Sequence, residues 1–162
     1  MIMGRKSVLL EGIVVGLAGA IAVAIWFLLY DLAEGVPFRT PALLAAALFH
    51  GLRDAGALTI TPGLVLEYSL VHGLAFVLFG LGTAGLFALV DRDRRVLFGV
   101  FMLFCCFEVF VLAMITALAA WLFHTLPPWT IIGGNLVAGL IMLAILFRDH
   151  SLSLGEVVTS AE

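Results

Sequence analysis

The chain has 162 residues, of which 64% are hydrophobic and only 12% are charged. Soluble domains average about 45 to 50% apolar and about 25% charged residues, so a water-soluble fold of this composition would expose too much apolar surface. The formal net charge of −3 is small and says nothing about partners, whereas the lack of a basic tract argues against nucleic acid as a partner. The composition therefore indicates an integral membrane protein whose first partner is the lipid bilayer.

Four apolar runs are each long enough to cross a hydrocarbon core of about 30 Å, which takes about 20 helical residues. Their unbroken hydrophobicity excludes a membrane barrel, whose strands alternate over about ten residues. The predicted fold is all-α, a single transmembrane domain over residues 1–162 in which four helices form a bundle and an outer loop covers residues 31–66. The runs are Val8–Tyr30, Leu70–Val90, Val96–His124 and Trp129–Phe147, within spans at about 8–30, 67–90, 96–125 and 129–147.

The first run carries small residues at intervals of four positions. Gly12, Gly16, Ala20 and Ala24 therefore share one face of the predicted helix, with Gly19 beside it. Small residues at this spacing let a second helix approach closely. The face is predicted to pack inside the chain's own bundle, and the alternative is a specific contact with a second copy or another subunit.

The outer loop contains the start and stop signals of a short helix. Thr40 followed by Pro41 is typical of an N-cap and a first helical residue, and Gly51 is typical of a helix end, so a helix is expected over 41–50. Ten residues cannot cross a bilayer, and we expect this helix to lie at the outer interface. Thr61 and Pro62 repeat the same start signal and predict the beginning of the second span.

Small residues also mark one face of the third run. At 100° per residue they fall within about 60° of one another and form a narrow face along the helix, which predicts close helix packing. Cys105 and Cys106 are adjacent and point about 100° apart, so we expect two buried small hydrophobes and no disulfide between them. The face comprises Gly99, Cys106, Ala113, Ala117, Ala120 and His124.

Pro127 and Pro128 end the third run and impose a short outer turn. The third and fourth runs are therefore predicted to form an antiparallel hairpin. The fourth run then has a small-residue patch in its outer half, which we expect to lie against the third run. The patch comprises Gly133, Gly134, Asn135, Ala138 and Gly139.

The distribution of Lys and Arg predicts the orientation, because cytoplasmic loops carry an excess of both. Six of the eight fall on the side of the N-terminus, so both termini are expected in the cytoplasm and the protein in the cytoplasmic, or inner, cell membrane. Five aromatic residues agree, because they fall at the opposite interface as an aromatic belt does. The inner cations are Arg5, Lys6, Arg92, Arg94, Arg95 and Arg148, the outer ones Arg39 and Arg53, and the aromatic residues Trp26, Tyr30, Tyr68, Trp121 and Trp129.

Glu108 lies twelve positions into the third run, about 18 Å from its inner end, where an ionised carboxylate costs several kcal/mol. It must be protonated, paired or in contact with water. If the small-residue face packs inside the bundle, Glu108 points outward, and with Asn135 it is a candidate intramembrane site for a proton or a partner. The alternative is a neutral carboxyl group that is hydrogen-bonded to a neighbouring backbone or to Asn135.

Three histidines, His50, His72 and His124, are predicted on the outer side, with Glu67 at a similar depth. Imidazole and carboxylate groups suit zinc or copper, and haem between His72 and His124 is geometrically conceivable. No two of the histidines are three or four positions apart, however, and interfaces tolerate histidine. Interfacial hydrogen bonding is therefore favoured, no cofactor is predicted, and metal or haem ligation is an alternative.

No motif in the sequence specifies a chemistry. A phosphate-binding loop, Cys-x-x-Cys, His-Glu-x-x-His and a nucleophile elbow are all absent, so no catalytic residue is predicted and an enzyme is not favoured. The packing signals favour an accessory or assembly subunit, or a homo-oligomer, that contacts other transmembrane helices. The alternative is a proton-coupled transporter of a small solute, or a metal- or haem-binding redox protein, that uses Glu108 and the outer histidines.

Overall fold

The computed structural model describes residues 8–90, 93 and 95–149, which fold into helices joined by turns. The prediction of an all-α fold is confirmed, because four of the described helices are long and apolar enough to cross a membrane. Arg5, Lys6, Arg92 and Arg94, on which the predicted orientation relies, lie outside the described residues. The elements are α1 (Val8–Ala33), α2 (Arg39–Phe49), η1 (Ala55–Ala57), α3 (Pro62–Val90), α4 (Val96–Ala119), η2 (Ala120–His124) and α5 (Pro128–Asp149).

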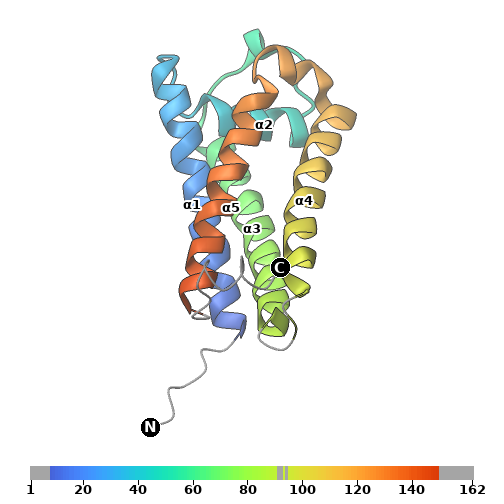
Figure 1. The fold of residues 1–162 in the computed structure, drawn as a ribbon. Coiled ribbons are helices and arrows are strands. Elements are labelled where there is room, and N and C mark those ends of the chain that lie inside the picture. The colour runs from blue at the N-terminus through green and yellow to red at the C-terminus, as the bar shows by residue number, and fades with distance from the viewer. Residues whose placement is uncertain (1–7, 91–92, 94, 150–162) are drawn as a thin grey trace.

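The four long helices run antiparallel in sequence order, and α2 lies across one end of the bundle (Figure 1). The start of α1 and the end of α5 both lie at the opposite end. The aromatic residues predicted at the outer interface gather at the α2 end, where Tyr30 and Trp129 meet edge to face with ring centroids 6.1 Å apart. The described part of the chain therefore begins and ends at the same end of the bundle (Figure 1).

The α1–α3 pair is the centre of the bundle, and its seam is built from glycine. A Cβ atom added to Gly16 would lie 2.7 Å from the Cα of Val77, and one added to Gly80 would lie 2.7 Å from the Cα of Gly16. The two backbones touch directly because no side chain separates them. Gly12 contacts α3 in the same way, and Ala20 is buried, so the small-residue face of α1 packs inside the chain from Gly12 to Ala20. The prediction is wrong for Ala24, which is exposed.

The next helix outward, α5, packs on α1 through Trp26. The indole Nε1 donates a hydrogen bond to the backbone oxygen of Thr130 at 2.9 Å, and the ring covers Gly133 and Gly134, where an added Cβ would lie 2.8 and 2.9 Å from ring atoms. The prediction that this patch lies against the third run is therefore wrong for these two glycines, whereas Gly139 and Asn135 do face α4. The flat indole needs a surface without side chains, and the two glycines provide it.

On the other side of the centre, α4 packs on α3 through phenylalanine rings. The ring of Phe79 lies 5.0 Å from that of Phe104 and 4.3 Å from that of Phe107. The predicted α4–α5 hairpin is confirmed, since a short turn at Pro127 joins the two helices, yet they make little contact with each other. The bundle is consequently open between α4 and α5.

The small-residue face of α4 points away from the bundle. No described atom lies within 4 Å of a Cβ added to Gly99, and Ala113 and Ala117 are exposed. The prediction that Cys105 and Cys106 are buried is wrong, because both are exposed. The physical reason is that α4 uses its phenylalanines to contact α3, which leaves the small residues on the outer side.

The short helix α2 is enclosed by the ends of the longer helices. Five consecutive residues, Ala42–Ala46, are buried, so α2 is covered around its whole circumference. The prediction of an N-cap at Thr40 is wrong: the helix begins at Arg39, after Phe38 in a left-handed conformation with φ of 62°. The backbone N–H and the hydroxyl of Thr40 instead donate hydrogen bonds of 2.8 and 2.6 Å to the carboxylate of Asp31, at the end of α1.

Candidate functional site

The divergence of α4 from α5 leaves an apolar groove of about 350 Å³ between them, here called the α4/α5 groove. This volume lies at the lower end of the range of about 300 to 1,000 Å³ that is typical of small-molecule sites. Phenylalanine rings from α3 and α4 form most of the wall, and leucines from α5 form the mouth. These lining residues include Phe76, Phe79, Phe104, Phe107, Leu136 and Leu140.

One polar pair interrupts this apolar wall. The side-chain Nδ2 of Asn135, on α5, donates a hydrogen bond of 2.7 Å to Oε2 of Glu108, on α4. The other carboxyl oxygen, Oε1, is buried and has no hydrogen-bond partner among the described residues. The structure therefore brings the two predicted site residues together. Their hydrogen bond is the alternative that the sequence allowed to an outward-facing Glu108.

The wall of the groove is an aromatic cluster that continues along α3. His72 lies with its ring centroid 4.7 Å from that of Phe76, and Phe76 meets Phe107 edge to face at 5.9 Å. Tyr68 stacks on His72 at 5.5 Å. Offset and edge-to-face contacts of this kind fix ring positions, so the wall that faces Glu108 is pre-formed.

A second apolar groove, also of about 350 Å³, lies between α1, α2 and α3. The polar atoms near it are largely engaged: the Ser69 hydroxyl donates to the oxygen of Val65 at 2.7 Å, and the carboxylate of Asp31 accepts both bonds from Thr40. His72 makes only a long contact of 3.4 Å, to the backbone oxygen of Ala20. Of the two grooves, the α4/α5 groove holds the buried carboxyl oxygen that has no partner among the described residues.

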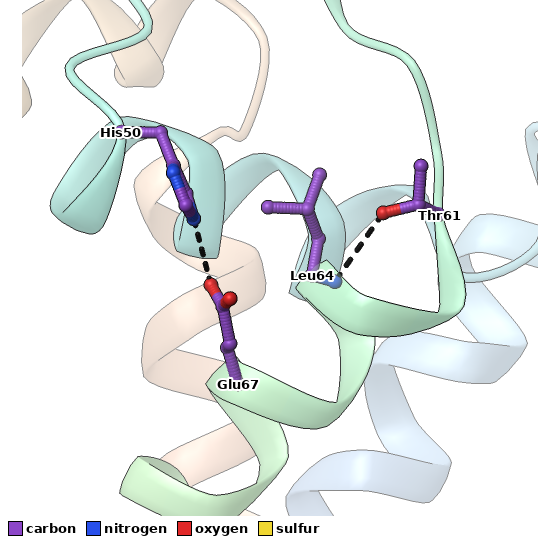
Figure 2. Close-up of polar contacts among 4 residues, drawn as sticks. All are labelled: His50, Thr61, Leu64 and Glu67. Atoms are coloured by element: carbon purple, nitrogen blue, oxygen red, sulfur yellow. Dashed lines mark hydrogen bonds and ion pairs between the residues drawn. The ribbon is translucent and has the colours of Figure 1, made fainter.

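The three outer histidines do not converge. Figure 2 shows His50, at the end of α2, bonded through Nε2 to Oε2 of Glu67 on α3 at 2.8 Å, with both side chains about half exposed. His72 faces Ala20, and His124 is exposed at the end of η2. Across the described ranges, no group of three or more His, Cys, Asp or Glu side chains is placed to hold a metal ion.

A comparison of the chain with protein-family models, curated proteins and solved structures finds no match. The functional assignment therefore rests on the geometry of the chain itself.

The sequence reasoning missed the α4/α5 groove and the role of Asp31. The groove exists because α4 and α5 make little contact, and hydrophobic periodicity does not report the separation of two helices. A signal was present, since Phe101, Phe104 and Phe107 recur every three positions and mark an aromatic side of α4. Asp31 acts across a turn on a helix that begins eight residues later, which a search for local caps does not reach.

Proposed function

We propose that this protein acts in the cytoplasmic, or inner, cell membrane through contacts between transmembrane helices, as an accessory or assembly subunit or as a homo-oligomer. In this proposal α4 supplies the contact surface. The termini lie in the cytoplasm, as the excess of Lys and Arg near the inner ends favours, and α2 lies at the outer interface.

The observation that carries the proposal is the outward direction of the small-residue face of α4. Lipid chains cover large apolar side chains as well as a protein does, so exposed phenylalanine or valine on a span needs no partner. Gly99, Ala113 and Ala117 differ, because small residues on an outer face let the backbone of another helix approach closely. No such approach occurs within the described part of the chain.

The spacing of these residues supports a seam along the whole helix. Gly99, Cys106, Ala113 and Ala120 recur at every seventh position. Twenty-one residues at 1.5 Å each cover about 32 Å, close to the thickness of the hydrocarbon core. A seven-residue repeat keeps facing a partner helix that crosses in a left-handed manner at about 20°.

Enlarging a residue of this face tests the proposal. Ala113→Leu should push the partner helix away and lower the amount of self-associated or co-purifying protein at least fivefold, as measured by native mass spectrometry after mild extraction. Ala75→Leu is the matched control, because Ala75 is exposed on α3, away from the small-residue face of α4, and the same enlargement there should change nothing. A monomer without partners in the unmodified protein, or equal effects of the two variants, would contradict the proposal.

A further inference from the structure

We propose that the α4/α5 groove binds an uncharged, membrane-dissolved molecule that carries a carbonyl group on an apolar chain or ring. The inference goes beyond the helix-contact function and does not rest on it, because the groove and the small-residue face lie on different sides of α4.

The need for an acceptor follows from the state of Glu108. A carboxyl group in an apolar wall without a cationic partner is stable in its protonated form. Since Oε2 accepts the hydrogen bond from Asn135, the proton belongs on Oε1, which has no partner in the described residues. A buried O–H donor of this kind requires an acceptor, and Glu108 is one of the residues that line the groove.

The depth of the pair restricts the occupant to uncharged molecules. Glu108 is twelve residues from the start of α4 and eleven from its end, which places it about 18 and 17 Å from the two ends, near the bilayer centre. A charged lipid headgroup is excluded from this depth, and the carbonyl groups that link it to the acyl chains also stay near the interface. The acceptor must therefore belong to a small molecule that is dissolved in the hydrocarbon region, and a carbonyl oxygen is the simplest uncharged acceptor.

The lining of the groove suits a narrow apolar body, because phenylalanine rings form its walls and leucines its mouth. A carbonyl group on a small molecule fits this site better than a transmembrane helix does, because the backbone carbonyl groups of a helix are already hydrogen-bonded within it. Leu136 is 62% exposed beside Asn135, so the mouth opens to the surrounding lipid.

A photoreactive ketone tests the assignment. The full-length protein in phosphatidylcholine vesicles is irradiated with 4-octylbenzophenone, whose carbonyl is both the hydrogen-bond acceptor and the reactive group, and adducts are mapped by peptide mass spectrometry. We expect at least fivefold more labelling in segments 101–108 and 132–143 than in other lipid-facing segments. A long-chain methyl ketone should compete at a concentration at least tenfold below that of an alkane of equal length.

Two pairs of variants distinguish binding at a specific site from nonspecific partitioning onto apolar surfaces. Leu136→Trp fills the mouth and should reduce groove labelling at least fivefold, whereas Val109→Trp, outside the groove, should leave it unchanged. Glu108→Gln keeps an N–H donor and should keep the preference for the ketone, whereas Glu108→Leu should abolish it. Labelling spread evenly over all lipid-facing segments, equal competition by ketone and alkane, or retained ketone preference in Glu108→Leu would overturn the proposal, whatever the association state of the protein.

Discussion

The α1–α3 seam and the outer face of α4 are built from the same kind of residue and meet opposite surroundings. In the seam, Gly16 and Gly80 bring two backbones into direct contact. On α4, Gly99, Ala113 and Ala117 point away from the bundle. A small-residue face therefore marks where a helix can be approached closely, and does not identify the helix that approaches.

The difference arises from what α3 offers to each neighbour. Toward α1 it presents Gly80, which matches the glycines of α1 and permits backbone contact. Toward α4 it presents Phe76 and Phe79. These rings pack against phenylalanine rings of α4. Since α4 contacts α3 through its large rings, its small residues remain on the outer side of the bundle.

The largest effect is expected from breaking the seam. Gly80→Leu would place a side chain against the backbone of Gly16, which cannot move aside without separating α1 from α3. Overpacking typically costs about 1 to 3 kcal/mol, and we expect a loss of about 3 kcal/mol or more because the clash is with backbone. Unfolding in mixed micelles titrated with dodecyl sulfate measures it.

The matched control for the seam lies two residues further along the same helix. No described atom lies within 4 Å of a Cβ added to Gly82, so Gly82→Leu should change the unfolding free energy by less than about 1 kcal/mol. Similar losses from Gly80→Leu and Gly82→Leu would show that α1 and α3 do not touch as described.

A second large effect is expected where α1 holds α2. Asp31→Ala removes both bonds to Thr40 and leaves a buried N–H and hydroxyl unpaired, at a cost of about 2 to 3 kcal/mol. Protease cleavage in the loop around Ala55 should rise with it, because α2 loses its anchor. Asp54→Ala, which removes only an exposed bond to Gly56, should cost much less, and equal effects would contradict the account of α2.

An intermediate effect is expected between α1 and α5. Trp26→Phe keeps most of the ring over the α5 glycines and loses the hydrogen bond to Thr130, at a cost of about 1 kcal/mol. Trp121→Phe is the control, because the buried Nε1 of Trp121 has no partner in the described structure and its removal should cost nothing in hydrogen bonding. A larger loss from Trp121→Phe, measured by the same unfolding titration, would reverse this assignment.

The smallest effect is expected at the exposed edge of α2. His50 and Glu67 are joined at 2.8 Å, but both side chains are about half exposed, so the pair is largely solvated (Figure 2). Pairs of this kind contribute about 0.5 kcal/mol or less. His50→Ala should therefore leave the free energy of unfolding nearly unchanged, as measured by the same titration. A loss of unfolding free energy above about 2 kcal/mol would mean that this contact anchors α2 more strongly than Asp31 does.

The sequence predicted the number and type of helices because length and hydrophobicity are properties of each segment alone. The two Thr-Pro signals show where local reasoning stops. At Thr61 the signal is accurate, since α3 begins at Pro62 and the Thr61 hydroxyl accepts a hydrogen bond of 3.4 Å from the N–H of Leu64 (Figure 2). At Thr40 it fails, because the carboxylate of Asp31 binds Thr40 and starts the helix earlier.

The candidate site was predictable only in part. The depth of Glu108 required a neutral or bonded carboxyl, and Asn135 was one of the partners that this requirement allowed. The groove around the pair depends on how far α4 stands from α5, which follows from Trp26 holding α5 on α1 and from the rings that hold α4 on α3. Such contacts between distant segments depend on side-chain shape and produce no periodic pattern in the sequence.

The reactivity of Cys106 in native membranes tests most directly whether another helix covers the outer face of α4. The thiol on this face, in a Cys105→Ser background, is compared with a thiol introduced on α3 by Leu78→Cys in a background where Cys105 and Cys106 are both replaced by serine; Leu78 is 61% exposed. With a lipid-soluble maleimide at native expression levels, we predict that Cys106 reacts at least tenfold more slowly than the thiol at position 78, and that dispersal in harsh detergent removes the difference. Equal rates in the native membrane would contradict the account, because they would show that only lipid covers this face.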